Sequence, residues 1–286
     1  MRDRIARWRM SRAYAIVLAV PIVAALAILA SGANVPVFRA LQGASRVVPQ
    51  ALFAPFWQSA TYAGDGLAVF ALATALLLQR PYAAWAGIVA AVPGALLLNG
   101  LKALIPYDRP ALVLMNDGVT VLGPALHHGS FPSGHSVAAG ILGGIVFLAY
   151  RHWAVRALGI AIALLIGMSR AAVGVHWPLD IAVGLALGWL SAWIGWQLAA
   201  DAPWARTPQA RIAGALILGA CAVGLWFHPM QLPAATPFRI ALAVTGLLLA
   251  VLALRIGVRE WRTARHAPAP WPAGRPRSPG PDPRDE

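Results

Sequence analysis

Three short polar clusters stand out in a chain that is otherwise mostly apolar. They are residues 102–110 (KALIPYDRP), residues 132–135 (PSGH) and residues 169–180 (SRAAVGVHWPLD). Together they supply three cations, Lys102, Arg109 and Arg170. Arginine can grip the oxygens of a phosphate with paired hydrogen bonds. These residue types therefore favour the binding of a phosphoryl group.

The third cluster also contains a histidine and an aspartate that can act together. His176 and Asp180 are four residues apart, so on a helical turn their side chains share one face and can meet. A carboxylate in this position orients the imidazole, and an imidazole with one free nitrogen is a plausible nucleophile. His135 would then give a proton to the departing oxygen and later take one from water.

The second cluster lies where an apolar segment begins. Backbone N–H groups at Ser133 and Gly134, together with the positive end of a helix dipole, can receive an anion there. Few carboxylates accompany the clusters, and these are Asp65, Asp108, Asp117 and Asp180. A two-metal carboxylate site is therefore not favoured. We predict a site without metal or cofactor, in which cations and helix amides neutralise the charge.

The elements that must position these residues are membrane helices. Of the 286 residues 59% are hydrophobic and 12% are charged, unlike an ordinary soluble domain. Apolar runs long enough to cross a hydrocarbon core of roughly 30 Å recur along the chain. They predict an all-α, polytopic membrane bundle with eight spans: 13–31, 63–79, 83–103, 134–150, 156–172, 179–199, 212–227 and 240–254. The first apolar run is too long for a usual signal peptide, so we interpret it as a retained anchor.

The charges predict how the bundle is oriented. The net charge is +13, and with the amino terminus inside, 17 of the 23 Lys and Arg residues fall on the cytoplasmic side. This is the positive-inside pattern of a membrane protein rather than a nucleic-acid-binding surface. Both termini are expected in the cytoplasm, and all three polar clusters at the outer face of a bacterial inner membrane.

The spacing of the clusters, K-x6-RP, PSGH and SR-x5-H-x3-D, resembles the signature of the type-2 phosphatidic acid phosphatase superfamily, which is shared with vanadium haloperoxidases. The resemblance covers about residues 98–199. It implies a nucleophilic His176 supported by Asp180, with His135 as the acid. It also implies phosphate contacts from Lys102, Arg109, Ser133, Gly134 and Arg170.

Relatives of this kind usually have a six-helix membrane core. We therefore divide the chain into a basic cytoplasmic N-terminus (1–12), a phosphatase core (13–200), two additional spans (201–257) and a disordered cytoplasmic tail (258–286), whose proline and charge content cannot build a core. Of the other polar residues, we interpret Asp65 as an interfacial residue, His127 and His128 as a solvated pair, and Asp108, which lies within the first cluster, as a surface carboxylate.

The predicted activity is hydrolysis of a lipid phosphate or diphosphate through a phosphohistidine intermediate. Undecaprenyl diphosphate, phosphatidic acid, phosphatidylglycerol phosphate and a lipid A phosphate all suit the resemblance, and the residues do not choose between them. A lipid phosphotransferase and a non-enzymatic lipid-phosphate carrier are the alternatives. Eight spans argue against a haloperoxidase, because those relatives are soluble. The oligomeric state is left open.

Overall fold

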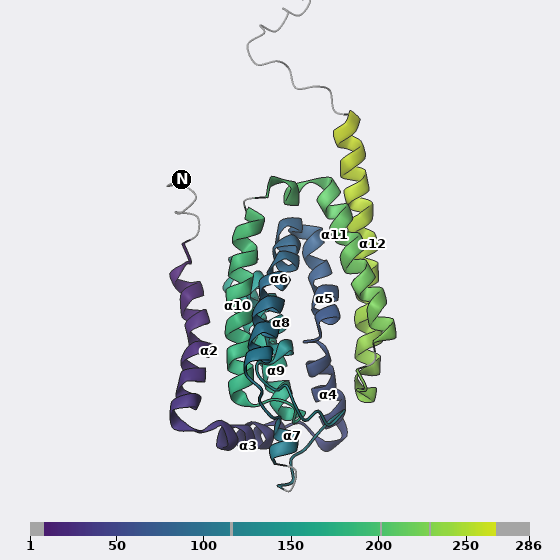
Figure 1. The fold of residues 1–286 in the computed structure, drawn as a ribbon. Coiled ribbons are helices and arrows are strands. Elements are labelled where there is room, and N and C mark those ends of the chain that lie inside the picture. Colours follow the sequence, from purple (N-terminus) through teal and green to yellow (C-terminus); the bar gives the residue numbers. More distant parts are fainter. Residues whose placement is uncertain (1–8, 115–116, 201, 229, 267–286) are drawn as a thin grey trace, which may run out of the picture.

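The computed structural model describes residues 9–114, 117–200, 202–228 and 230–266, and these residues form a bundle of helices without strands (Figure 1). The helices are α2 (Arg12–Ser31), α3 (Asn34–Ser45), α4 (Gln50–Tyr62), α5 (Gly66–Gln79), α6 (Pro81–Leu104), α7 (Pro110–Val113), α8 (Gly134–Ala149), α9 (Trp153–Ala172), α10 (Pro178–Ala200), η1 (Pro203–Arg206), α11 (Pro208–Gly224), η2 (Leu225–Phe227), η3 (Pro233–Ala235) and α12 (Thr236–His266). The protein is thus an all-α, multi-span membrane bundle, as predicted.

Each of the eight predicted spans contains a helix, but two of these helices are short. Six helices are long and apolar enough to cross a membrane, and a seventh span arises if α4 and α5 are taken as one helix bent by 72°. Helix α8 has 16 residues, about 24 Å at 1.5 Å per residue. Most of its residues are buried among other helices, so it does not need to match the thickness of the lipid by itself.

The segment 32–62, between the first two predicted spans, was expected to be a loop, but it contains the helices α3 and α4. In Figure 1, α3 lies across the lower end of the bundle. Helix α4 and helix α5 belong to one apolar run that is interrupted before Gly66. The Asp65 carboxylate accepts a hydrogen bond from the N–H of Leu67 at 2.9 Å and so starts α5 in a new direction.

A second correction concerns the end of the last span. Helix α12 continues to His266, past the predicted end at 254 and into the segment predicted to be disordered. Arg211 of α11 forms an ion pair with Glu260 at 3.1 Å, which ties the extension to its neighbour. The rest of the predicted tail lies outside the described residues.

Helix α2 packs against the rest of the bundle. Tyr14 is fully buried, and its hydroxyl donates a hydrogen bond to the carbonyl of Trp189 in α10 at 2.7 Å. Its ring also meets Phe147 of α8 edge to face.

Close contact between α8 and α10 sets the position of the polar clusters. A Cβ atom on Gly188 would lie 2.2 Å from the carbonyl oxygen of Val137, and one on Gly184 would lie 2.6 Å from that of Ser133. Small residues are what allow membrane helices to approach this closely. Because the two backbones touch, the first turn of α8 lies against the first turn of α10.

The turn between α9 and α10 is equally constrained. Gly174 has a φ of +80°, and a Cβ atom there would lie 2.3 Å from the carbonyl oxygen of Thr120. Glycine adopts this backbone region without steric cost. The turn reverses the chain within a few residues and delivers His176 to the start of α10.

Candidate active site

The three polar clusters converge at the lower end of the bundle in Figure 1. Lys102 lies in the last turn of α6 and Arg170 in the last turn of α9. Ser133 caps α8, and His176 lies just before α10. The four central helices therefore all begin or end beside the same small volume.

His176 and Asp180 meet as predicted, although His176 lies in the turn before α10 and not on the helix itself. His176 Nδ1 lies 3.3 Å from Asp180 Oδ2, and both side chains are buried. The same carboxylate oxygen accepts hydrogen bonds from Ser130 Oγ at 2.5 Å and from the N–H of Trp177 at 2.9 Å. With Asp180 fixed in this way, Nδ1 of the imidazole carries the proton that faces it, and Nε2 is left for chemistry.

Arg109 lies directly over that second nitrogen. Its Nη1 is 3.3 Å from His176 Nε2 and donates to the carbonyl of Val175 at 3.1 Å. Its Nε donates to the carbonyl of His128 at 2.9 Å. Because carbonyls rather than a carboxylate hold this buried guanidinium, its positive charge remains available to an anion.

The surroundings of His176 favour its neutral form. Burial lowers the pKa of this imidazole well below its ordinary value, and the charges of Arg170, Arg109, His135 and Lys102 lower that pKa further. Only a neutral imidazole has a lone pair on Nε2. The histidine is therefore ready to act as a nucleophile at neutral pH.

The remaining two cations of the signature border the same volume. Lys102 Nζ donates to the carbonyl of Gly129 at 2.5 Å, and that oxygen also accepts from Arg109 Nη2 at 3.3 Å. Arg170 is 6% exposed and donates through Nη1 to the hydroxyl of Thr61, while its Nε has no partner within the described residues. An unpartnered N–H on a buried guanidinium can donate a hydrogen bond to a bound anion.

The start of α8 differs from the prediction in one detail. The N–H of Ser133 does not face an anion, because it donates to the backbone carbonyl of Asp180 at 3.1 Å. The Ser133 hydroxyl caps the helix by accepting from the N–H of Ser136 at 3.3 Å. The amides of Gly134 and His135 in the first turn are therefore the ones that can meet an anion.

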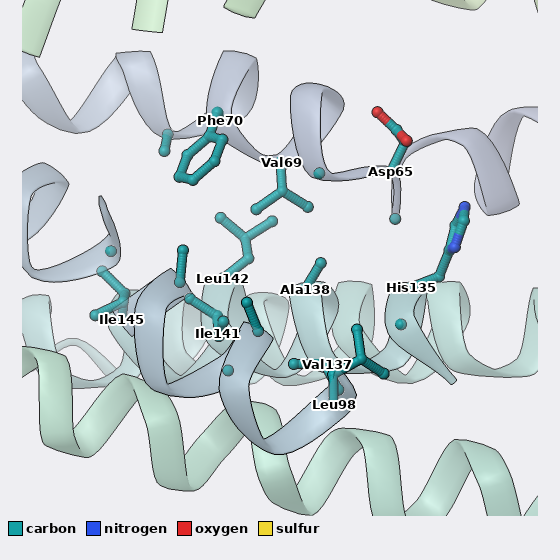
Figure 2. Close-up of a pocket in the computed structure, with 18 of the residues that line it drawn as sticks. Asp65, Val69, Phe70, Leu98, His135, Val137, Ala138, Ile141, Leu142 and Ile145 are labelled. Atoms are coloured by element: carbon teal, nitrogen blue, oxygen red, sulfur yellow. The ribbon is translucent and has the colours of Figure 1, made fainter. Parts of the chain in front are cut away.

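An apolar cavity of about 330 Å³ opens beside His135, between α5, α6 and α8. Figure 2 shows Asp65 and His135 at one end of this cavity, Val69 and Phe70 further along it, and Ile145 at the far end. His135 Nε2 is buried and has no partner among the described residues. His135 therefore lies between the cationic cluster and a hydrocarbon-lined space.

The other polar residues at this end of the bundle differ in where their side chains lie. Asp108 forms an exposed ion pair with His128 at 2.8 Å, so neither side chain faces the site. His127 is exposed as well. Asp65, which we interpreted as interfacial, lies in the wall of the cavity and is 3.4 Å from His228 Nε2.

The sequence analysis did not identify several residues that contact the residues of the site. Ser130 holds the Asp180 carboxylate, Thr61 holds Arg170, and His228 reaches Asp65 from the link that follows η2. None of them has a spacing that marks it, because each meets its partner only through the tertiary fold. Ser130 was the easiest to find, since it lies three residues before a predicted site residue.

The fold and the arrangement of these residues define an integral membrane protein with a cluster of cations around a buried histidine. The profile of the PAP2 superfamily matches residues 81–204, which include all eight residues of the predicted site. The crystal structure of Aquifex aeolicus LpxE is 30% identical in sequence and superposes with a TM-score of 0.50, covering 57% of this chain and 93% of that one. The chain belongs to the PAP2 superfamily.

Two curated relatives show where the similarity is concentrated. The lipid A 1-phosphatase of Rhizobium johnstonii is 36% identical over 120 residues, which are 40% of this chain and 48% of that protein. The undecaprenyl-diphosphatase of Sulfolobus acidocaldarius is 43% identical over 63 residues, 22% of this chain and 30% of that protein. The chain thus spans about half the length of the first of these relatives and less of the second.

The hydrogen bond from Ser130 to Asp180 makes a testable contribution to stability. Replacing Ser130→Ala removes a donor from a buried carboxylate, so we expect the free energy of unfolding in detergent to fall by about 1.5–3 kcal/mol. Ser191→Ala is the matched control, because Ser191 is equally buried and its hydroxyl has no partner within the described chain. Equal losses in the two variants would contradict a special role for the Ser130 bond.

Proposed function

We propose that this protein is a membrane lipid phosphatase whose nucleophile is His176. The observation that carries the proposal is the arrangement around that imidazole, with Asp180 on one nitrogen and Arg109 over the other. A phosphate that displaces the Arg109 contact would bring its phosphorus to Nε2 and its oxygens to the guanidinium. The similarity to a lipid A 1-phosphatase and to an undecaprenyl-diphosphatase supports the same assignment.

In the first step, Nε2 of His176 attacks phosphorus, a P–N bond forms, and the P–O bond to the lipid breaks. Lys102, Arg109 and Arg170 stabilise the charge on the three equatorial oxygens, together with the amides at the start of α8. His135 gives its proton to the departing oxygen. The negative charge of the bound phosphate favours the protonated imidazole that this transfer requires.

In the second step, water attacks the phosphohistidine. His135, now neutral, takes a proton from this water as the P–N bond breaks, and inorganic phosphate leaves. Asp180 stays bonded to Nδ1 of His176 throughout and stabilises the positive charge that develops on the imidazole. Both steps use the same residues, and His135 returns to its starting form.

The apolar cavity supports a lipid as the substrate. It begins at the proposed acid, His135, and runs along α5, α6 and α8 toward the middle of the bundle. The leaving oxygen of a lipid phosphate carries the hydrocarbon chain, so the chain would enter the cavity as the phosphate meets His176. A lipid A phosphate and undecaprenyl diphosphate are the substrates we favour, since relatives that carry the matching segment are named for them.

The central prediction concerns phosphate release by purified protein in detergent. We expect release from one or more of the four lipid classes named above, unchanged by excess EDTA because cations of the chain neutralise the phosphate. His176→Ala should lose at least about 10³-fold in rate. His152→Ala removes a histidine at the opposite end of the bundle and should keep full activity.

Other results of this assay would overturn the assignment in distinct ways. Activity that persists in His176→Ala would mean that another residue is the nucleophile. Transfer of phosphate to an acceptor lipid, with little free phosphate, would identify a phosphotransferase. A well-folded wild type that binds the lipids without turnover would identify a carrier.

The role of His135 predicts a dependence on the leaving group. His135→Ala should slow release of a lipid alcohol from its monophosphate by about 10²–10⁴-fold, because that alkoxide needs a proton. Release of nitrophenolate from p-nitrophenyl phosphate should slow far less, since nitrophenolate leaves without protonation. The measurement is the first-turnover release of the leaving group, which precedes hydrolysis of the phosphohistidine. Equal losses for the two substrates would rule out the role of proton donor.

We further propose that the site faces the periplasm and that both ends of the chain are cytoplasmic. The described arginines at the end opposite the site outnumber those near it, in agreement with the positive-inside rule. Arg239, on the same side as the site, donates to the carbonyls of Leu225 and Trp226 and so has a local structural role.

The orientation can be tested by labelling single cysteines from one side of the membrane. In a Cys221→Ala background, Asp117→Cys should react with a membrane-impermeant thiol reagent in intact spheroplasts. Arg262→Cys, exposed at the other end of α12, should react only after lysis. The reverse pattern would place the site in the cytoplasm.

A further inference from the structure

We propose that the end of the bundle opposite the candidate active site binds the headgroup of an anionic phospholipid. A cavity of about 620 Å³ lies there, between the turn from α5 to α6, the end of α8, the end of α10 and the start of α11. Its position corresponds to the upper end of the bundle in Figure 1. Four arginines line it: Arg80, Arg151, Arg206 and Arg211.

These arginines are held mostly by groups that leave their charge uncompensated. The guanidinium of Arg206 lies over the ring of Tyr82, 4.5 Å from its centroid, and that of Arg80 lies over Tyr150 at 4.9 Å. Stacking on a ring leaves the N–H groups at the edge of the guanidinium free to donate. The planar donors are thereby oriented before a ligand arrives.

None of the described residues that line this cavity carries a carboxylate. Within the described residues Arg80, Arg151 and Arg206 form no ion pair with a carboxylate. Arg211 differs, because it pairs with Glu260 at 3.1 Å and also donates to the carbonyls of Leu77 and Leu78. Arg211 therefore has a structural role in the wall of the cavity. Arg80, Arg151 and Arg206 supply the net positive charge of the cavity.

A helix terminus adds to this positive charge. Helix α6, 24 residues long, begins at Pro81 in the wall of the cavity, and no side chain caps its first turn. Helix α11 begins nearby at Pro208 but is capped by the hydroxyl of Thr207. The positive end of the α6 dipole favours an anion at the same place as the three guanidinium groups.

The apolar part of the cavity points to a lipid rather than a free phosphate. Leu148 and Trp196 line the cavity beside the arginines, and Trp204 is half exposed on η1 at the same level of the bundle. Tryptophan and tyrosine gather at the membrane interface, and basic pockets between helices at that level bind anionic headgroups. A phosphodiester headgroup would meet the guanidinium groups while its chains remain in the bilayer.

The proposal can be tested on the full-length protein in a neutral detergent. The bound fraction of phosphatidylglycerol, of cardiolipin and of phosphatidylcholine is measured by native mass spectrometry over a range of lipid concentrations. Wild type should bind the two anionic lipids in preference to phosphatidylcholine. The double variant Arg151→Gln/Arg206→Gln should bind them roughly 25-fold more weakly, at about fivefold for each arginine lost.

The matched control is Arg259→Gln/Arg262→Gln, which removes the same charge from α12 outside the cavity and should bind the anionic lipids like wild type. Equal weakening in both double variants would show that the general charge of this face, and not the cavity, attracts the lipid. Equal binding of phosphatidylcholine would also overturn the proposal. Inorganic phosphate that displaces the lipid at similar concentration would identify a site for free phosphate instead.

A conservative double variant, Arg151→Lys/Arg206→Lys, covers the case in which the glutamine variant fails to fold. It keeps both charges but not the planar donors, so its binding should lie between that of the wild type and that of the glutamine variant, whereas a purely structural effect of the stacked arginine would weaken binding as much as glutamine does. The lipids used are phosphodiesters and the readout is binding alone. The result is therefore independent of whether the candidate active site hydrolyses phosphate.

Discussion

The site depends on one buried carboxylate, that of Asp180. Its Oδ2 accepts from Ser130, from the backbone of Trp177 and from the imidazole of His176, while its backbone carbonyl accepts from Ser133. One residue thus joins the loop before α8, the first turn of α8, the turn after α9 and the start of α10. A carboxylate taken out of water requires such partners, because an unpaired buried charge costs several kcal/mol. The hydrogen bonds to Oδ2 therefore hold together the segments that carry the candidate site, while Oδ1 has no partner among the described residues.

The helices can meet at Asp180 only because α8 and α10 approach within backbone contact. The glycines along this interface, among them Gly184 and Gly188, have no room for a Cβ atom. In lipid, close packing of this kind supplies much of the attraction between helices, since the surrounding chains are as apolar as the side chains. The same contact explains how a helix of only 16 residues can lie at the centre of the protein.

The sequence was a good guide where function imposes a local spacing. His176 and Asp180 are four residues apart and meet where the turn before α10 leads into that helix, and the apolar runs predicted each of the long helices. The sequence did not reveal residues that contact the site only through the tertiary fold. Nothing near Thr61 points to Arg170, 109 positions further on, and nothing near His228 points to Asp65. Helices α3 and α4 were missed for a related reason: each is too short to be recognised by membrane-spanning length.

The pair Asp65 and His228 shows how the helices beyond the matched region take part in the structure of the site. The superfamily profile ends at residue 204, yet His228 follows η2 and lies against the wall of the cavity next to His135. Tyr62 of α4 donates to the His228 carbonyl at 2.5 Å, and Gln58 accepts from the N–H of Ala234 at 2.9 Å. These contacts fasten the link between α11 and α12 to the bend between α4 and α5. Since that bend forms one end of the apolar cavity, α11 and α12 help to set the shape of the space in which we propose a lipid chain to lie.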